Sequence, residues 1–302
     1  MEGRIWRPFA LKYDISHDLA WENAMEKIAI AAIAKNEGKY IIEWLAYHLA
    51  IKFDEILVFC NDSMDDMCDK LVRIAVEDHR VKVIDWPSRA GVSPQLSAYR
   101  EATRISSADW IVFIDIDEFI VPFDHSNIKD WLNSIPADVS AVALNWRGFG
   151  SSGITDESYE FVTQTFTKCS ERDWDNNLHF KTIARRSKLA SVLIHQAAPS
   201  EGRYVLSDLQ DLCMRNIGSS TRVVHNGIQI NHYQSKTWTE FERRMKRGNA
   251  NFPAGHPQHL RDAGFERFQA LDRNEQEDLA IRKYDAAMQT EYRRLSKIIA
   301  GS

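Results

Sequence analysis

Short apolar runs alternate with helix-length amphipathic segments along the first part of the chain. Four of these runs are rich in β-branched and aromatic residues and predict buried strands at residues 28–34, 55–60, 81–84 and 110–114. The segment after the first run repeats apolar side chains at helical spacing, with Ile41, Trp44 and Leu45 on one face. Such alternation is typical of βαβ units, so we expect an α/β fold with a mostly parallel sheet flanked by helices.

The pattern changes after residue 122. The later apolar runs predict a short helix and three further strands, at residues 128–135, 139–145, 180–184 and 192–195. We expect the last two strands to extend the sheet in a mixed or antiparallel manner. Because no repeat or obvious linker interrupts the sequence, we expect an N-terminal extension at 1–26, one α/β domain at 27–238 and a helical C-terminal segment at 239–302.

Composition narrows the class of protein. The 302 residues are 44% hydrophobic and 27% charged, which is ordinary for a globular protein with a real core. With 38 Lys and Arg against 43 Asp and Glu, the formal charge of −5 disfavours an electrostatic nucleic-acid binder. Four cysteines without a CxxC pair favour reduced thiols in a cytosolic protein. Without a signal-peptide core or a long apolar run, we expect a soluble protein, at most peripheral on a membrane.

The residues that follow each predicted strand are the first candidates for a site, because ligands of open α/β sheets lie beyond the carboxyl ends of the strands. The acidic stretch after the fourth strand is the most informative of these loops. Asp115 and Asp117 point to the same side of an extended segment, and two hard oxygen donors on one face suit Mg²⁺ or Mn²⁺. The alternative is a solvated acidic turn, but the buried strand before it favours a functional site.

A second candidate element lies near residue 232. The neutral imidazole of His232 could complete the coordination of a divalent ion, and Lys236 could meet the phosphates of a bound nucleotide as a point charge. The alternative for a lone histidine is a hydrogen-bonded structural residue. The companion lysine and the need for a third metal ligand favour metal binding.

These motifs carry a family resemblance. Asn36 and Glu37 after the first strand, Asp62 after the second and the Asp-x-Asp-Glu-Phe sequence at 115–119 together resemble glycosyltransferases of the GT-A fold, which is Rossmann-like. More narrowly, the sequence is similar to family 92 and related bacterial family 2 glycosyltransferases. The segments that carry this narrower resemblance are Glu43-Trp44 with His48, residues 145–153, and Asn231-His232-Tyr233 followed by Lys236.

The resemblance implies a metal-dependent transfer of a sugar from a nucleotide-sugar donor, with a UDP-sugar expected. By this analogy the donor site comprises Ala34, Lys35, Asn36, Glu37, Asp62, Asp115 and Lys236. The same analogy gives Mn²⁺ or Mg²⁺ to Asp115, Asp117 and His232. Neutralising the developing charge of the diphosphate leaving group lowers the barrier to transfer.

The acceptor site is expected at the Gly/Ser-rich loop after the strand that follows the acidic motif. Trp146 offers an aromatic face on which a sugar ring can stack, and Gly150, Ser151 and Ser152 would let the sugar approach closely. The alternative is a plain turn, because glycine and serine are common turn residues. A glycan or glycolipid is the expected acceptor.

The catalytic base is the least legible part of the sequence. The resemblance implies inversion at the anomeric carbon, which requires a base for the acceptor hydroxyl. His195 matches a histidine that recurs in similar proteins, and Glu171, Asp173 and Asp175 form a polar cluster before the strand that carries Lys181. Such a cluster is usually solvated, and Lys181 is equally compatible with the surface.

The basic amphipathic segment at 241–247 has two interpretations. It is either a solvated helix face packed on the domain or a contact with anionic lipid at the cytoplasmic face of the inner membrane. The second interpretation suits a glycolipid acceptor and a role in polysaccharide or lipopolysaccharide biosynthesis.

Two other functions compete with glycosyl transfer. An aspartyl-phosphate phosphatase also begins with an apolar strand that ends in Asp-x-Asp, but Phe119 and three earlier βα units depart from that pattern. A catalytically silent nucleotide-sugar or glycan-binding protein on the same scaffold stays open as the alternative, since the base is not legible.

Overall fold

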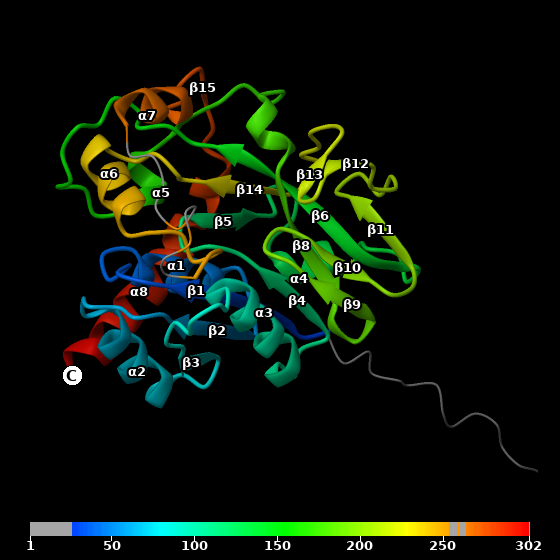
Figure 1. The fold of residues 1–302 in the computed structure, drawn as a ribbon, viewed down its shortest axis with the longest axis horizontal. Coiled ribbons are helices and arrows are strands. Elements are labelled where there is room, and N and C mark those ends of the chain that lie inside the picture. Colours follow the sequence, from blue (N-terminus) through cyan, green and yellow to red (C-terminus); the bar gives the residue numbers. More distant parts are fainter. Residues whose placement is uncertain (1–25, 254–255, 257–258, 260–263, 302) are drawn as a thin grey trace, which may run out of the picture.

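The structure is a computed structural model that describes residues 26–253, 256, 259 and 264–301. The expected N-terminal extension lies outside these residues apart from Glu26. A nine-stranded sheet in the order β3-β2-β1-β4-β8-β6-β14-β5, with β11 also paired to β6, forms the centre of the molecule (Figure 1). Helices cover both faces of its parallel part, which confirms the expected α/β class.

The parallel part is built as the sequence predicts. Its strands are β1 (Ile28–Ala34), β2 (Glu55–Cys60), β3 (Val81–Asp85) and β4 (Trp110–Phe113). The connecting helices are α1 (Ile41–Ala50), α2 (Met67–Glu77) and α3 (Pro94–Ile105). Every residue of β1 is buried, and alternate side chains face opposite layers: Ile30 packs in the core with α1 and α2, whereas Ala31 packs with α3.

The second part of the sheet is mixed. Its elements are β5 (Glu118–Val121), α4 (Ile128–Leu132), β6 (Val139–Gly148), β8 (Phe180–Arg185), β11 (Arg203–Leu206) and β14 (Gln229–His232). Strand β8 is antiparallel to both β4 and β6, which confirms the expected direction of the sheet extension. The long β6 is parallel to β11 along its first half and to β14 along its last three residues, so it joins two groups of strands.

The strand predicted at residues 192–195 is wrong. Strand β9 (Leu189–Val192) ends where that strand was expected to begin, and β10 (Ala197–Pro199) runs back antiparallel to it. The chain turns between them, with Leu193 N–H donating to Gln196 O at 2.7 Å. A short apolar run has no periodicity that separates a strand from a turn, and here the turn brings His195 to the sheet.

Smaller elements complete the described part of the molecule. They are α5 (Val162–Thr165), β7 (Lys168–Cys169), β12 (Met214–Asn216), β13 (Ser219–Ser220), β15 (Gln276–Glu277) and three short 3₁₀ turns at Asp175–Leu178, Arg186–Lys188 and Ala280–Tyr284.

The C-terminal part is helical, as the sequence predicts. It contains α6 (Trp238–Lys246), α7 (Phe265–Leu271) and α8 (Asp285–Ala300). Helix α8 packs against α1 and α2, and its Met288 and Leu295 belong to the main core (Figure 1). The last helix therefore stabilises the helical layer behind the parallel strands. None of the described helices combines the length and apolar character needed to cross a bilayer.

Candidate active site

Three adjoining cavities open at the carboxyl ends of the parallel strands, and we name them A, B and C. Cavity A is lined by residues that include Ala34, Lys35, Glu37, Asp62, Gln95, Asp115, Asp117, Arg244 and Arg247. Cavity B is lined by residues that include Asn36, Lys39, Tyr40, Lys236, Glu240 and Arg243, together with Glu37, Asp117, Arg244 and Arg247. Cavity C is lined by residues that include Gln95, Asp115, Trp146, His195, His232 and Arg244. Because Arg244 lines all three cavities, they form one candidate site.

Asp115 is held by side chains from the sheet and from α3. Lys181 Nζ of β8 lies 3.1 Å from Asp115 Oδ2, and Lys181 is completely buried. Gln95 Nε2 donates to Asp115 Oδ1 at 2.8 Å, and the Tyr99 hydroxyl donates to the same oxygen at 3.3 Å. Burial by itself would raise the pKa of Asp115, but the Lys181 ammonium holds this pKa below its usual value. Asp115 is therefore a charged carboxylate in a fixed position.

Glu118, the first residue of β5, shares this buried cluster. Its Oε2 accepts a hydrogen bond from Asp115 N–H at 2.9 Å and lies 3.6 Å from Lys181 Nζ. Burial, reinforced by the charges of Asp115 and Asp117, raises the pKa of Glu118 well above its usual range. For Lys181, burial would lower the pKa, but Asp115 and Glu118 outweigh it and raise the pKa. Lys181 thus stays charged inside the protein and neutralises Asp115.

Asp117 has a different counter-charge, supplied by helix α6. Arg244 Nη2 lies 2.9 Å from Asp117 Oδ2, and His232 Nε2 lies 3.6 Å from the same oxygen. Burial opposes ionisation of this carboxyl, but Arg244 and then His232 hold the pKa of Asp117 well below its usual value. The Asp117 side chain is only 8% exposed.

His232 brings an unpartnered imidazole to Asp117. Within the part of the chain that the structure describes, neither ring nitrogen of His232 has a hydrogen-bond partner. Burial lowers the pKa of His232, which favours the neutral form that binds metals. A carboxylate oxygen and an imidazole nitrogen facing each other fit Mn²⁺ or Mg²⁺, with phosphate or water completing the coordination. Among the described residues, no group of three or more His, Cys, Asp or Glu side chains is arranged so that it could hold a metal ion by itself.

Asn36 connects two loops of the site by hydrogen bonds. Its N–H donates to Ser63 Oγ at 3.0 Å, and its Oδ1 accepts from Met64 N–H at 2.7 Å. Its backbone is left-handed, with φ of 52°, a conformation that asparagine tolerates better than most residues. Asn36 therefore ties the loop after β1 to the loop after β2, and it lines cavity B rather than cavity A.

The other residues expected at the donor meet in cavity A. Asp62 accepts a hydrogen bond from Ser88 N–H at 3.3 Å, which joins the loops after β2 and β3. Arg247 Nη1 lies 2.5 Å from Glu37 Oε1 and donates to Lys35 O at 2.8 Å. The structure thus brings the ends of three parallel strands together with the end of α6.

Lys236 lies in cavity B, buried beside the acidic loop. Its Nζ donates to Tyr233 O at 3.0 Å and sits 4.7 Å from the centre of the Tyr40 ring. Burial lowers the pKa of Lys236, while Asp117 and Glu37 act in the opposite direction. Lys236 and Asp117 thus line the same cavity, and their charges influence each other without an ion pair.

Trp146 is the one expected acceptor residue that the structure brings to the three cavities. Its ring lies against His232, with 4.2 Å between the ring centres, and it lines cavity C beside Asp115 and His195. Its indole Nε1 has no hydrogen-bond partner among the described residues. Trp146 is thus a largely buried wall residue of cavity C, packed among His179, His195 and His232.

The Gly/Ser-rich loop lies elsewhere. Gly150, Ser151 and Ser152 line none of the three cavities. The Ser151 hydroxyl donates to Asp272 Oδ2 at 3.0 Å, and Ser152 N–H donates to Asn274 Oδ1 at 2.7 Å. A Cβ added to Gly150 would lie 2.3 Å from a backbone oxygen of the same C-terminal segment. The loop joins the domain to its C-terminal region, and glycine is needed for this close approach.

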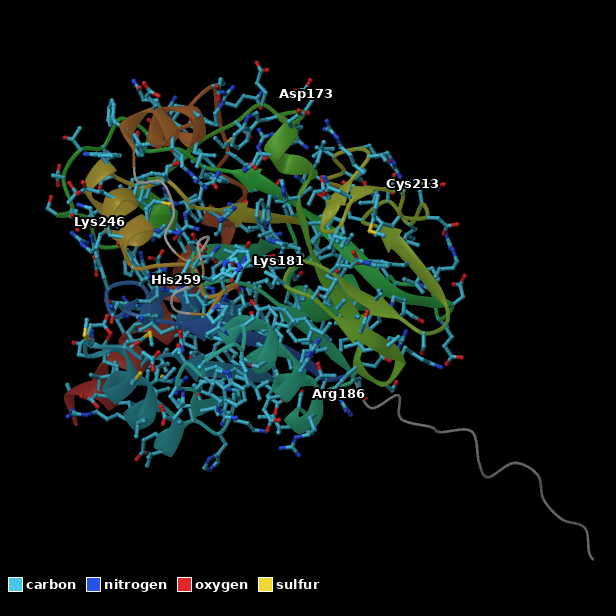
Figure 2. All side chains as sticks on the ribbon, viewed as in Figure 1. Asp173, Lys181, Arg186, Cys213, Lys246 and His259 are labelled. Atoms are coloured by element: carbon cyan, nitrogen blue, oxygen red, sulfur yellow. The ribbon has the colours of Figure 1, made fainter. Side chains whose placement is uncertain are left out.

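Only one of the base candidates reaches the site. His195 lies at the turn between β9 and β10 and lines cavity C. Burial, with help from Lys181, lowers the pKa of His195 to about 3, so its imidazole is neutral at physiological pH. Asp173 and Asp175 are exposed, as is Glu171, and the first two line a separate cavity. Figure 2 shows Asp173 at the edge of the molecule, apart from Lys181.

Sequence reasoning missed the cations that complete the site. The basic segment of α6 was expected to be solvated or to face lipid, yet Arg244 and Arg247 turn into cavity A, with side chains only 19% and 24% exposed. The side chains of Arg243 and Lys246 are more exposed, at 60% and 65%, although Arg243 also lines cavity B and pairs with Glu157. A spacing of three residues on a helix that follows Lys236 was the available signal. Lys181, compatible with a surface position, is instead fully buried.

The fold and cavities define an α/β protein with a candidate site, lined by charged residues, at the carboxyl edge of its parallel strands. The chain belongs to glycosyltransferase family 92, whose family model matches residues 29–267. This match confirms the predicted resemblance to family 92.

Several plant proteins of this family are similar to the chain. One from Ricinus communis is 22% identical over 231 residues, covering 75% of this chain and 38% of the relative. One from Oryza sativa subsp. japonica is 25% identical over 232 residues, covering 74% and 35%. The chain thus spans less than two fifths of the length of these curated relatives.

The solved structures that resemble this one include glucosyl-3-phosphoglycerate synthase from Mycobacterium tuberculosis. Its complex with Mn²⁺, UDP and glucosyl-3-phosphoglycerate is 18% identical, with a TM-score of 0.34, covering 57% of this chain and 64% of the synthase. Its complex with Mn²⁺, UDP and phosphoglyceric acid is 16% identical, with a TM-score of 0.35, covering 67% and 72%.

Proposed function

We propose that the protein is a glycosyltransferase of the GT-A type that moves a sugar from a nucleotide-sugar donor to a hydroxyl of a glycan or glycolipid. One observation carries the proposal: Asp115 and Asp117 follow a buried parallel strand and face cavities lined by the loops after β1 and β2, in a chain of family 92. Carboxylates at this edge of a sheet are suited to hold the charged part of a nucleotide ligand.

The nucleoside is assigned to cavity A, and UDP is the expected nucleotide. Asp62, Lys35 and Glu37 supply polar groups for the base and ribose there. The diphosphate lies toward Lys236, whose buried ammonium is a point charge for a phosphate oxygen.

The cation is assigned to Asp117, Asp115 and His232, with Mn²⁺ or Mg²⁺ expected. The support is that His232 Nε2, which has no hydrogen-bond partner among the described residues, lies 3.6 Å from Asp117 Oδ2. When bound, such an ion stabilises the negative charge that develops on the leaving diphosphate. Lys181 contributes by keeping Asp115 ionised without occupying the cavity side of the carboxylate.

His195 is the proposed base of an inverting reaction. It stands in cavity C beside Trp146, where a stacked acceptor would present its hydroxyl, and its Nδ1 has no hydrogen-bond partner among the described residues. A neutral imidazole has a free lone pair for the hydroxyl proton. Trp146 positions the acceptor by stacking against a sugar ring.

If the acceptor is a glycolipid, the enzyme must work at a membrane surface. We therefore also propose a location at the cytoplasmic face of the inner membrane, with a role in polysaccharide or lipopolysaccharide biosynthesis. The exposed cations Arg243 and Lys246 of α6 could meet anionic lipid. Sedimentation with anionic vesicles tests this: binding that disappears in the Arg243→Gln, Lys246→Gln double variant supports it, and no binding by the wild type removes it.

The first experiment is a thermal-shift panel of UDP-, GDP-, CMP- and dTDP-sugars with and without Mn²⁺. A ligand that binds only the folded state raises the unfolding midpoint by mass action. We expect a shift that requires one nucleotide and the metal together, followed by sugar transfer to an acceptor from a glycan panel. Binding without turnover on any acceptor would favour the silent binding protein, and no shift with any pair would contradict the donor assignment.

A further inference from the structure

Two ion pairs separate cavity A from cavity B. Glu37, Asp117, Arg244 and Arg247 line both cavities, and they are paired as Asp117 with Arg244, at 2.9 Å, and Glu37 with Arg247, at 2.5 Å. In each pair the carboxylate belongs to a loop of the sheet and the guanidinium to the end of α6. The partition between the cavities therefore consists of charged groups that can exchange partners.

The two cavities hold complementary parts of the donor site. Cavity A contains the loops around Asp62, whereas cavity B contains the ammonium of Lys236. Within the described residues no carboxylate lies within ion-pair distance of Lys236 Nζ, so this buried cation has room for an anion. A diphosphate that reaches from cavity A to Lys236 must pass the Asp117–Arg244 pair.

Arg244 and a divalent cation would use the same atom. Arg244 Nη2 and His232 Nε2 both face Asp117 Oδ2, and a cation held by Asp117 and His232 would lie where the guanidinium now neutralises the carboxylate. Two positive groups cannot share one buried oxygen without strong repulsion.

We propose that Arg244 is a competitor for the cation at Asp117, which leaves this carboxylate when the cation binds and pairs with the diphosphate of the donor instead. This inference rests on the proposed function, because it takes the diphosphate and the cation from it. A guanidinium forks well onto phosphate oxygens, so the arginine exchanges one anion for another and is not left unpaired. Metal and donor binding are thereby coupled through one side chain.

The surroundings of Arg244 allow this exchange. Its side chain is 19% exposed, and its other hydrogen bond goes to the backbone oxygen of Gln234, at 3.2 Å. Arg247 keeps α6 attached through Glu37 and Lys35 O, so Arg244 can turn without undocking the helix. Arg244 is therefore a donor-binding residue that contacts the diphosphate directly.

The test is a titration of the full chain with Mn²⁺ alone, followed by electron paramagnetic resonance of the free ion, in the wild type and in Arg244→Gln. We expect the variant to bind Mn²⁺ at least about tenfold more tightly, because a charged competitor is removed. The variant should bind the Mn²⁺–pyrophosphate complex at least about tenfold more weakly than the wild type, because it lacks the guanidinium that pairs with the diphosphate.

The matched control is Lys246→Gln, which removes a cation from the outer side of the same helix and should change neither titration. Arg244→Lys keeps a charge without the fork and should restore the wild-type Mn²⁺ affinity more than the pyrophosphate affinity. Circular dichroism and the unfolding midpoint of each variant establish that it is folded.

The possible results distinguish a failure of the competition by Arg244 from a failure of the metal assignment at Asp117 and His232. Equal or weaker Mn²⁺ binding by Arg244→Gln, in a wild type that binds the ion, overturns the competition and leaves the metal assignment standing. Absence of Mn²⁺ binding from both proteins overturns both the metal assignment and this inference. Tighter Mn²⁺ binding with unchanged pyrophosphate binding contradicts the transfer of Arg244 to the diphosphate.

Discussion

The two carboxylates of the acidic loop are neutralised by two different regions of the molecule. Asp115 faces the sheet, where Lys181 of β8 is completely buried and also approaches Glu118. Asp117 faces helix α6, where Arg244 lines three cavities and keeps contact with solvent. Two residues of separation along the chain thus lead to one counter-ion fixed in the core and another at a cavity wall.

Because of this difference, we expect Asp115 to keep its ion pair permanently and Asp117 to exchange its ion pair when ligands bind. A fully buried cation that left its carboxylate would lose solvation without replacement, so the Lys181–Asp115 pair is permanent. An arginine on a cavity wall can exchange a carboxylate for a phosphate at little cost. We therefore call Asp115 with Lys181 and Glu118 the fixed side, which maintains the shape and charge of the site. We call Asp117 with Arg244 the responsive side, because its ion pair can change when ligands bind.

The strongest test of the comparison is Asp117→Ala. We expect kcat/KM for sugar transfer to fall by at least about a thousandfold, because the carboxylate on the responsive side would no longer hold the cation or Arg244. The fold should be retained, since the residue lies in a loop after β4. Asp175→Ala, an exposed aspartate outside the three cavities, is the matched control and should stay fully active. Normal turnover by Asp117→Ala would refute the metal assignment.

Lys181→Met tests the fixed side. We expect the free energy of unfolding to drop by about 3–5 kcal/mol, because removing one partner leaves Asp115 uncompensated beside buried Glu118. Urea denaturation at neutral pH measures the loss. Lys188→Met removes a lysine from an exposed pair with Glu201 and should cost less than about 1 kcal/mol. Equal effects of the two substitutions would contradict a structural role for Lys181.

His195→Gln asks whether the fixed side also holds the catalytic base. We expect kcat to fall about a hundredfold, with the KM of the donor nearly unchanged, because the loss concerns proton transfer from the acceptor. Since the pKa of His195 lies near 3, no acid limb from this residue is expected between pH 5 and 8. The exposed His79→Gln is the control. An unchanged kcat would leave His195 as a packing residue.

The pH dependence of the free energy of unfolding tests the burial of His48, which packs against Phe119 in the main core. The His48 ring stacks on Phe119, its Nδ1 bonds to Trp44 O at 2.9 Å, and burial lowers its pKa to about 3. The unfolded chain, with a histidine pKa near 6.5, binds a proton that the folded state rejects. Stability contributed by the neutral ring is therefore present above pH 6.5 and is lost as pH falls toward 3, by about 1.4 kcal/mol per pH unit.

Chemical denaturation between pH 4.5 and 7 checks this dependence. His48→Gln should flatten the slope by up to that amount, whereas His79→Gln should leave it unchanged. An identical slope in His48→Gln and the wild type would mean that the His48 ring takes up its proton in the folded state.

The smallest expected effect concerns the loop that belongs to neither side. Ser151→Ala removes the hydroxyl contact to Asp272 and should lower the free energy of unfolding by about 1 kcal/mol. The KM for the acceptor should not change, because Ser151 lines none of the three cavities. A large rise in acceptor KM would return this loop to the acceptor site.

The sequence by itself determined the parallel half of the fold and the residues at the ends of its strands. Buried parallel strands need continuous apolar runs, and their carboxyl ends meet at one edge, so Asp62, Asp115 and Asp117 could be placed together from local pattern alone. The segment around residue 232 and the family resemblance added His232 and Lys236. Each of these features is recognised from a short stretch of sequence.

Only the tertiary structure decided which distant side chains meet those carboxylates. The composition of α6 is compatible with water, lipid or a charged cavity, and docking of the helix selected Arg244 and Arg247 for the cavity. The burial of Lys181 depends likewise on the pairing of β8 with β4 and β6, and the ring contact of His195 with Trp146 depends on the packing of the β9–β10 turn against β6. The physical reason is that a buried charged residue requires a partner of opposite charge, and long-range packing determines which residue becomes that partner.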